Sequence, residues 1–281
     1  LKKILEAIYE PRFLNCMYGF RPNRGCHDAI KELYKRLNNT KICYIVDADI
    51  KGFFDHMKHE WIIKFLYLYI KDPNIIGLVK KYLKVGVIDG GELMMNEEGS
   101  AQGNIISPIL ANIYMHNVLT LWYKFIITKE CKGDNFLIVY ADDFVAGFQY
   151  KWEAENYYKL LKERMEKFGL QLEESKSHLL QSGAYIARAK QKSGESTRLE
   201  TFDFLGFTFY CGRSRKGMPY IMPKTSSKKF RQKIRDIKVW IYANRDQSLK
   251  KLMGMLNLKL VGHYRYYGIS FNGRMISNYK Q

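Results

Sequence analysis

Two adjacent aspartates, Asp142 and Asp143, lie between apolar runs at residues 136–140 and 144–148. Like charges a few ångströms apart repel strongly where water is scarce, so such a pair is unstable unless a cation neutralises it. A third carboxylate, Asp49, lies near the end of another apolar run, residues 42–50. Because no His or Cys accompanies these hard oxygen ligands, they favour Mg²⁺, with Mn²⁺ as a substitute, over zinc.

Three carboxylates from two strands suit a two-metal site, in which ions about 3.5–4 Å apart activate a 3′-hydroxyl and stabilise departing pyrophosphate. Phosphoryl transfer requires little more than such positioning and charge neutralisation. The alternative is that the acidic pair simply favours a turn. The apolar runs on both sides of the pair, and the presence of Asp49, argue against that alternative.

The elements that must position these aspartates follow from the apolar pattern. Residues 42–50 are apolar and β-branched enough for a buried strand, and the runs around the acidic pair predict a β-hairpin. If that strand pairs with the hairpin, Asp49 meets Asp142. Residues 59–85 have helical spacing that is broken at Pro73, and residues 152–168 predict a helix that stops at Gly169. Helices and strands are therefore mixed, without strict alternation.

Positive charge is concentrated toward the C-terminal end. The chain carries +18 with a pI near 9.5. Residues 211–281 hold 17 Lys and Arg against two Asp, whereas residues 1–210 are close to neutral. After a cap at Ser226 or Ser227, apolar residues recur every three to four positions from Phe230 to Ile241, which predicts an amphipathic helix with a cationic exterior. Such charge indicates nucleic acid or an anionic membrane as partner.

The tetrapeptide Tyr140-Ala-Asp-Asp143 matches the active-site hairpin of reverse transcriptases, and further motifs follow that family's order. They are Tyr18-Gly-Phe-Arg-Pro-Asn-Arg24, Asp47-Ala-Asp-Ile-Lys-Gly-Phe-Phe-Asp55, Gln102-Gly-Asn-Ile-Ile-Ser-Pro-Ile-Leu-Ala-Asn-Ile-Tyr114, Gly169-Leu-Gln-Leu-Glu-Glu-Ser-Lys176 and Phe202-Asp-Phe-Leu-Gly-Phe207. Together they resemble the group II intron class, often called intron maturases. Residues 256–267 resemble the end of that family's thumb, or X domain.

The resemblance implies an α+β fold, a right-hand polymerase with an antiparallel palm sheet packed on helices and a helical thumb. Residues 1–210 would form the fingers and palm, and residues 211–281 an incomplete basic thumb, or maturase X domain. Because Leu1 begins directly on a helical pattern, we expect the first part of the fingers to be missing. The resemblance makes Asp49, Asp142 and Asp143 catalytic ligands of two Mg²⁺, assisted by the backbone carbonyl of Ile50.

Further roles follow from the resemblance. Phe54, five residues beyond Asp49, would be the steric gate that excludes a ribose 2′-hydroxyl. Gln102, Arg21 and Lys176 would lie near the incoming nucleotide, with Lys176 neutralising or protonating pyrophosphate. Taken alone, each of these residues has a plainer interpretation: core packing for Phe54, an ordinary turn for Gln102 and a solvated side chain for Lys176.

Two positions depart from the family's pattern beside the nucleotide pocket. Ala101 stands where Pro is usual, and Asn104 where Gly is common. Both changes are expected to relax the loop that positions Gln102. The three aspartates are intact, which argues against a degenerate descendant that only binds RNA.

The sequence thus predicts an RNA-directed DNA polymerase that uses dNTPs, an RNA template and a DNA primer, and that binds structured intron RNA. Two alternatives remain open: an RNA-binding maturase that promotes splicing, and a host-encoded relative in phage defence or repair. No apolar run reaches the roughly 18–20 residues of a bilayer span. We therefore expect a soluble intracellular protein with no membrane partner, in a bacterial cytoplasm or an organelle.

Overall fold

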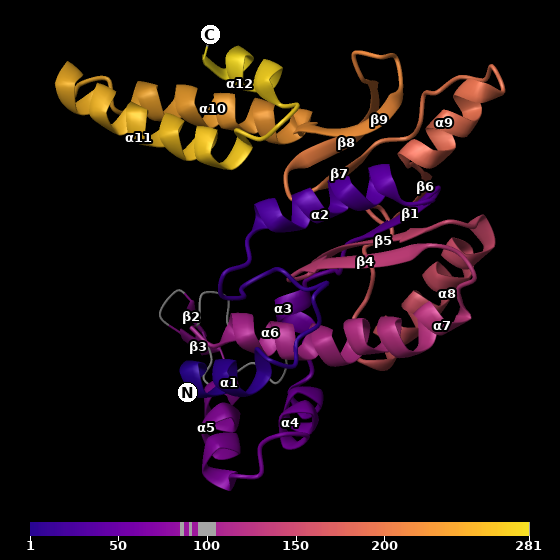
Figure 1. Cartoon of the computed structure of the whole chain (residues 1–281). Coiled ribbons are helices and arrows are strands. Elements are labelled where there is room, and N and C mark those ends of the chain that lie inside the picture. Colours follow the sequence, from indigo (N-terminus) through magenta and orange to yellow (C-terminus); the bar gives the residue numbers. More distant parts are fainter. Residues whose placement is uncertain (85–86, 90–91, 95–104, 281) are drawn as a thin grey trace.

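A four-stranded antiparallel sheet carries the acidic residues. The computed structural model describes residues 1–84, 87–89, 92–94 and 105–280. The strand order in this sheet is β4-β5-β1-β6 (Figure 1). The strands are β1 (Tyr44–Ala48), β4 (Asn135–Tyr140), β5 (Asp143–Phe148) and β6 (His178–Gln181). The predicted strand before Asp49 and the predicted hairpin are both present.

The register of the sheet decides which aspartates face each other. β1 runs antiparallel to β5, and continuing their register places Asp49 opposite Asp143. The sequence pattern predicts Asp142 at that place, one residue away. The turn explains the difference: the last pair of the hairpin joins Tyr140 to Asp143, so Ala141 and Asp142 form a two-residue loop outside the ladder.

The two faces of the sheet pack on different helices, because alternate side chains along a strand point in opposite directions. Val46 and Phe144 belong to the core formed with α6 and α8, whereas Ile45 and Val145 belong to the core formed with α2. In Figure 1, α2 lies on one side of the sheet, and α6, α7 and α8 lie on the other. The bounds are α2 (Cys26–Asn39), α6 (Ser107–Met115), α7 (Thr128–Glu130) and α8 (Lys151–Lys167), with π-helical turns at η1 (His116–Thr120) and η2 (Tyr123–Ile127).

Short helices and a small hairpin form the end of the molecule that contains the N-terminus (Figure 1). The elements are α1 (Lys2–Tyr9), α3 (Phe53–His56), α4 (His59–Tyr67), α5 (Pro73–Lys84), β2 (Val87–Asp89) and β3 (Glu92–Met94). Pro73 is the first residue of α5, where a missing N–H breaks no helical hydrogen bond. The predicted break at Pro73 is therefore confirmed.

A second antiparallel sheet leads into a helical arm. After α9 (Ala184–Lys192), it consists of β7 (Phe202–Phe204), β8 (Phe207–Arg213) and β9 (Pro219–Thr225). The helices α10 (Ser227–Ala243) and α11 (Leu249–Tyr267) project side by side, and α12 (Gly273–Lys280) crosses them near the body (Figure 1).

Ser226 is the N-cap residue of α10, as predicted. Phe230, Ile234 and Ile237 are half-buried, whereas Ile241 is exposed farther along the arm. The expected domain boundary at residue 210 falls inside β8, because the charge pattern that set it does not follow strand pairing. The helical part begins only at Ser227, and the division into two domains stays a prediction.

Candidate active site

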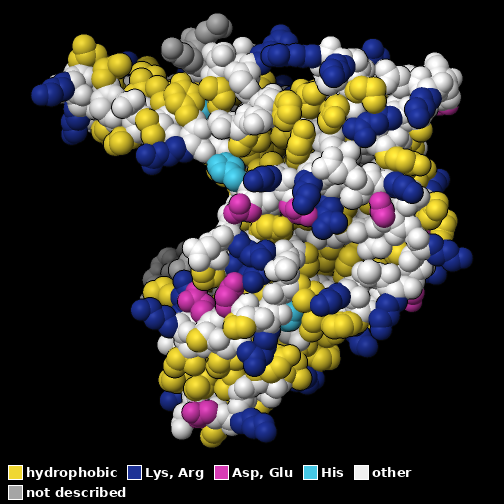
Figure 2. Space-filling model, viewed as in Figure 1, with side chains coloured by type: hydrophobic (Ala, Val, Ile, Leu, Met, Phe, Trp, Pro, Cys, Tyr) yellow, Lys and Arg dark blue, Asp and Glu magenta, His cyan; other side chains and the backbone are white. Residues whose placement is uncertain are grey.

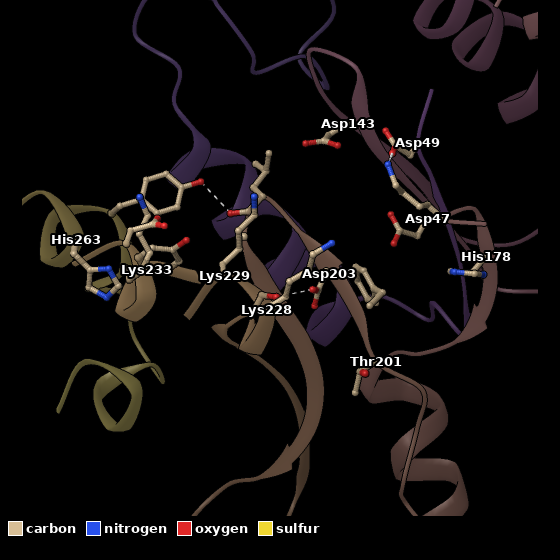
Figure 3. Close-up of a pocket in the computed structure, with 18 of the residues that line it drawn as sticks. Asp47, Asp49, Asp143, His178, Thr201, Asp203, Lys228, Lys229, Lys233 and His263 are labelled. Carbon is tan, nitrogen blue, oxygen red and sulfur yellow. Dashed lines mark hydrogen bonds and ion pairs between the residues drawn. The ribbon is translucent and has the colours of Figure 1, made fainter. Parts of the chain in front are cut away.

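A cleft of about 1090 Å³ lies between one end of the four-stranded sheet and the helical arm. Figure 2 shows the molecule hollowed on this side, beneath the projecting arm. The sheet side of the cleft is lined by Asp47, Asp49, Asp143, Lys176 and His178. The arm side is lined by Asp203, Lys228, Lys229, Lys233 and His263 (Figure 3). Carboxylates and ammonium groups therefore face each other across the cleft.

Two neighbouring strands bring the predicted carboxylates together. Asp47 and Asp49 are two residues apart at the end of β1, so their side chains lie on one face. Asp143 begins β5 opposite Asp49, and Asp142 occupies the adjoining turn. In Figure 3, Asp47, Asp49 and Asp143 lie along the same side of the pocket. The fourth carboxylate, Asp47, is an addition to the predicted three.

Burial, with the charges of neighbouring carboxylates, raises the pKa of Asp143, Asp47 and Asp142. Partial burial, followed by the charges of Asp142 and Asp49, raises the pKa of Asp143 to about 6. Burial, followed by the charges of Asp143, Asp203 and Asp49, raises the pKa of Asp47 to about 8. Burial and the Asp49 charge also raise the pKa of Asp142. Negative charge is therefore concentrated beyond what its surroundings readily solvate, and a cation would relieve it.

Backbone pairing indicates the direction of the Ile50 carbonyl. Ile50 forms an isolated antiparallel bridge with Leu172. The bonds of this bridge come from the neighbours, since Glu173 N–H donates to the Asp49 carbonyl and Lys51 N–H donates to the Gln171 carbonyl. In an antiparallel pair the N–H and C=O of the residue between such bonds point to the opposite side. For Ile50 that side faces β5, where Asp143 lies.

Lys176 supplies positive charge at the carboxylates. Its Nζ donates a hydrogen bond to Asp49 Oδ2 over 2.7 Å. This hydrogen bond raises the pKa of Lys176. The positive charges of Lys229 and Lys176 offset part of the rise in the pKa of Asp143. The prediction that Lys176 lies in the pocket agrees with its position, and its part in chemistry stays a prediction.

The other predicted nucleotide contacts are placed differently. Phe54 is half-buried in α3, with its ring 5.4 Å from that of Phe53, and it does not line the described cleft. Arg21 is buried, and its guanidinium pairs with Glu10 at 2.8 Å and donates to backbone carbonyls. The structure thus brings neither side chain into the cleft, and their roles stay predictions. Gln102 lies outside the described residues, as do Ala101 and Asn104.

The motif at residues 18–24 supports the acidic hairpin through its backbone. Tyr18 N–H donates to the carbonyl of Val139 over 2.8 Å. A Cβ atom on Gly19 would lie 2.4 Å from the backbone nitrogen of Ala141, a contact that only glycine avoids. Asn112 Nδ2 donates to the Gly19 carbonyl over 2.8 Å. These contacts fix the position of the hairpin turn relative to the segment at residues 18–24.

Two parts of the cleft had no role in the sequence prediction. The period of two already indicates that Asp47 shares a face with Asp49, but no function was predicted for it. The lysines of the arm, Lys229 and Lys233, lie four residues apart on one face of α10, just after its cap. Their helix was predicted, but only the tertiary fold shows that this face turns toward the aspartates.

The donor set suits a hard divalent cation, because carboxylate and carbonyl oxygens are the ligands such ions prefer. Within the described residues, however, no three Asp, Glu, His or Cys side chains converge as one metal site. The ammonium group on Asp49 Oδ2 takes the place of a cation there. The residues present are therefore of the type that binds a divalent metal ion, and one of them, Asp49, is paired with Lys176.

Comparison with known families decides the class of this site. Residues 1–209 match the family described as reverse transcriptase (RNA-dependent DNA polymerase). The chain belongs to the reverse transcriptase family. Members of this family use divalent metal ions, in agreement with the donor set.

Similar curated proteins place this reverse transcriptase close to the group II intron class, as predicted. The group II intron-encoded protein LtrA of Lactococcus lactis subsp. cremoris is 39% identical over 131 residues, 47% of this chain and 21% of that protein. A nuclear intron maturase of Arabidopsis thaliana is 31% identical over 84 residues, 30% of this chain and 12% of that protein. The chain thus matches about a fifth or less of the length of these two relatives.

Solved structures confirm the right-hand polymerase fold of this reverse transcriptase. Apo telomerase from Candida tropicalis superposes with a TM-score of 0.56 at 14% identity, over 81% of this chain and 40% of that one. Telomerase from Candida albicans gives a TM-score of 0.53 at 15% identity, over 80% and 36%. In the described part of the chain, no helix has the length and apolar character needed to span a bilayer.

Proposed function

We propose that this chain is an RNA-directed DNA polymerase that adds deoxynucleotides from dNTPs to a DNA primer on an RNA template. One observation carries the proposal: Asp49 and Asp143 lie opposite each other on paired strands and line a cleft that also contains lysines, with Asp142 in the turn next to Asp143. Membership of the reverse transcriptase family supports the same chemistry. The lysines of the arm, Lys228, Lys229 and Lys233, suit the phosphates of a bound duplex.

In this proposal Asp49, Asp142, Asp143 and the Ile50 carbonyl hold two Mg²⁺, for which Mn²⁺ can substitute. When bound, these ions supply activation of the primer 3′-hydroxyl and charge stabilisation for the departing pyrophosphate. Lys176 lies beside the site, where its ammonium group can neutralise or protonate that pyrophosphate.

Primer extension tests the proposal directly. The chain is incubated with a DNA primer annealed to an RNA template, dNTPs and Mg²⁺, and product length is measured. We expect extension that follows the template sequence. A chain that binds the duplex tightly and adds no nucleotide contradicts the polymerase and leaves RNA binding as the leading function.

Phe54 is proposed as the steric gate for the incoming sugar. We expect Phe54→Ala to increase incorporation of ribonucleotides relative to deoxynucleotides, because the smaller side chain leaves room for a 2′-hydroxyl. Competition between the two nucleotide types in primer extension measures this selectivity. Unchanged selectivity in a folded variant would assign Phe54 to packing against Phe53.

A second candidate function, binding of folded RNA in support of splicing, is favoured by a cationic surface away from the cleft. The tip of the β8–β9 hairpin exposes three cations, Arg213, Arg215 and Lys216. Within the described residues none of the three pairs with a carboxylate. β8 spans seven residues, so this tip lies about 20 Å from the strand's other end beside the cleft.

This hairpin tip is held in one conformation. Ser214 N–H donates to the Met218 carbonyl over 2.8 Å, and Gly217 has φ 75°, as a tight turn requires. Gln191 of α9 donates to the Gly217 carbonyl over 3.2 Å. Figure 2 shows Lys and Arg side chains gathered along this upper edge of the molecule. Such a fixed group of cations is suited to closely spaced phosphates on RNA.

The test replaces all three cations with Gln. We expect the slope of log affinity against log salt for a folded RNA to fall by about 3, since each phosphate contact contributes about 1. Extension of a short primer–template should be unchanged. Three exposed lysines of α8, Lys151, Lys159 and Lys167, replaced with Gln form the matched control. An unchanged slope would show that this surface does not bind the RNA. If the triple variant lost only its binding to anionic vesicles, the surface would bind a membrane.

A further inference from the structure

Hydrogen bonds hold the backbone around Lys176 beside Asp49. Glu173 N–H donates to the Asp49 carbonyl over 2.8 Å, and Lys176 N–H donates to the Glu173 carbonyl over 3.0 Å. Asp49 N–H also donates to Ser177 Oγ over 3.4 Å. The segment around Lys176 is thus attached to the residue that its side chain contacts. The long side chain is 64% exposed, so few neighbouring atoms enclose it.

The contact uses an oxygen that the proposed metal site needs. With Lys176 Nζ at 2.7 Å, Asp49 Oδ2 is already bonded to a positive charge. A divalent ion that binds that oxygen while the ammonium group remains would lie within a few ångströms of another positive charge, which weakens its binding. The same ammonium also offsets the repulsion between Asp143 and its acidic neighbours.

We infer that Lys176 is an exchangeable cation: it closes the site on Asp49 when no divalent ion is bound, and an arriving ion displaces it toward the substrate phosphates. This inference rests on the metal site of the proposed function. It gives Lys176 two opposite effects, one on metal binding and one on the rate of the reaction. Lys176 weakens metal binding to the free protein, and the displaced ammonium then assists the reaction.

Removing the ammonium group of Lys176 should strengthen metal binding to the free protein. With Lys176→Met the side chain keeps its length and loses its charge, so the metal no longer competes with an ammonium. We expect the Kd for Mn²⁺, measured by titration without nucleic acid, to fall about two- to fivefold, the range for an exposed ion pair. Primer extension by the same variant should become slower. If Lys176 only supported the structure of the site, its replacement would weaken Mn²⁺ binding and also slow primer extension.

Two matched variants complete the experiment. Lys176→Arg keeps the charge, so its Kd for Mn²⁺ should stay at or above the wild-type value. Lys162 pairs with Glu174 at 2.8 Å on the surface outside the cleft, so Lys162→Met should leave the Kd unchanged. An unchanged or higher Kd in Lys176→Met overturns the exchange. Because Mn²⁺ binding is read without nucleotide, a chain that shows the exchange but extends no primer would contradict only the polymerase.

Discussion

Asp142→Asn/Asp143→Asn is expected to lower the rate of primer extension by at least about 10³-fold. Metal ions contribute several kcal/mol of charge stabilisation to phosphoryl transfer, and each 1.36 kcal/mol corresponds to a factor of ten. Asn keeps the size of Asp but removes the negative charge that the metal ions require. The measurement is single-nucleotide addition to a primer on an RNA template, with wild type and variant at equal concentration.

Loss of charge should leave nucleic-acid binding intact. Because two negative charges disappear from the hairpin at the cleft, affinity for the primer–template should stay equal or rise. Asp246, which is exposed at the far end of the arm, provides the control substitution Asp246→Asn, with unchanged extension expected. Extension by the double variant within tenfold of wild type would show that these carboxylates do not hold the catalytic metals.

Affinity for an RNA–DNA duplex is expected to fall about 10³–10⁵-fold between 50 and 200 mM salt, if six to ten phosphates are contacted. The physical reason is release of counterions when lysines on the arm side of the cleft meet the phosphates. Equilibrium binding at several salt concentrations measures the slope. An affinity that does not depend on salt would show that these lysines do not bind the nucleic-acid phosphates.

The contribution of the arm can be separated within the same measurement. Replacing Lys228, Lys229 and Lys233 with Gln should reduce the salt slope by about 3, because each phosphate contact contributes about 1. The three α8 lysines replaced with Gln serve again as the control, since they lie outside the cleft. An equal reduction in both triple variants would mean that total charge, and no particular surface, governs binding.

Most of the local structure was predictable because it depends on neighbours in the chain. The acidic hairpin, the break at Pro73 and the cap at Ser226 each follow from residues within one turn or strand. The boundary expected at residue 210 lies within β8, and the division into two domains stays a prediction, because composition carries no information on strand pairing. The register that sets Asp49 opposite Asp143 likewise depends on where the turn closes.

The site was predictable in its carboxylates and not in its surroundings. Asp49, Asp142 and Asp143 are brought together by two strands whose patterns are evident. The nearby ammonium groups come from separate elements, so neither Lys176 on Asp49 nor Lys229 near Asp143 follows from spacing. The role of Arg21 near the nucleotide stays a prediction, and the sequence did not indicate that its guanidinium pairs with Glu10 and donates to backbone carbonyls.

The strand order β4-β5-β1-β6 also has a consequence for synthesis of the chain. β1 occupies residues 44–48, but its partners are residues 143–148 and 178–181. At about 5–20 residues per second, a ribosome needs about 5–20 s to make the roughly 100 residues between β1 and β5. During that interval β1 is an apolar segment without a partner, exposed to chaperones and to aggregation. Asp49 therefore cannot meet Asp143 until β5 has left the ribosome, so the catalytic centre is assembled only late in synthesis.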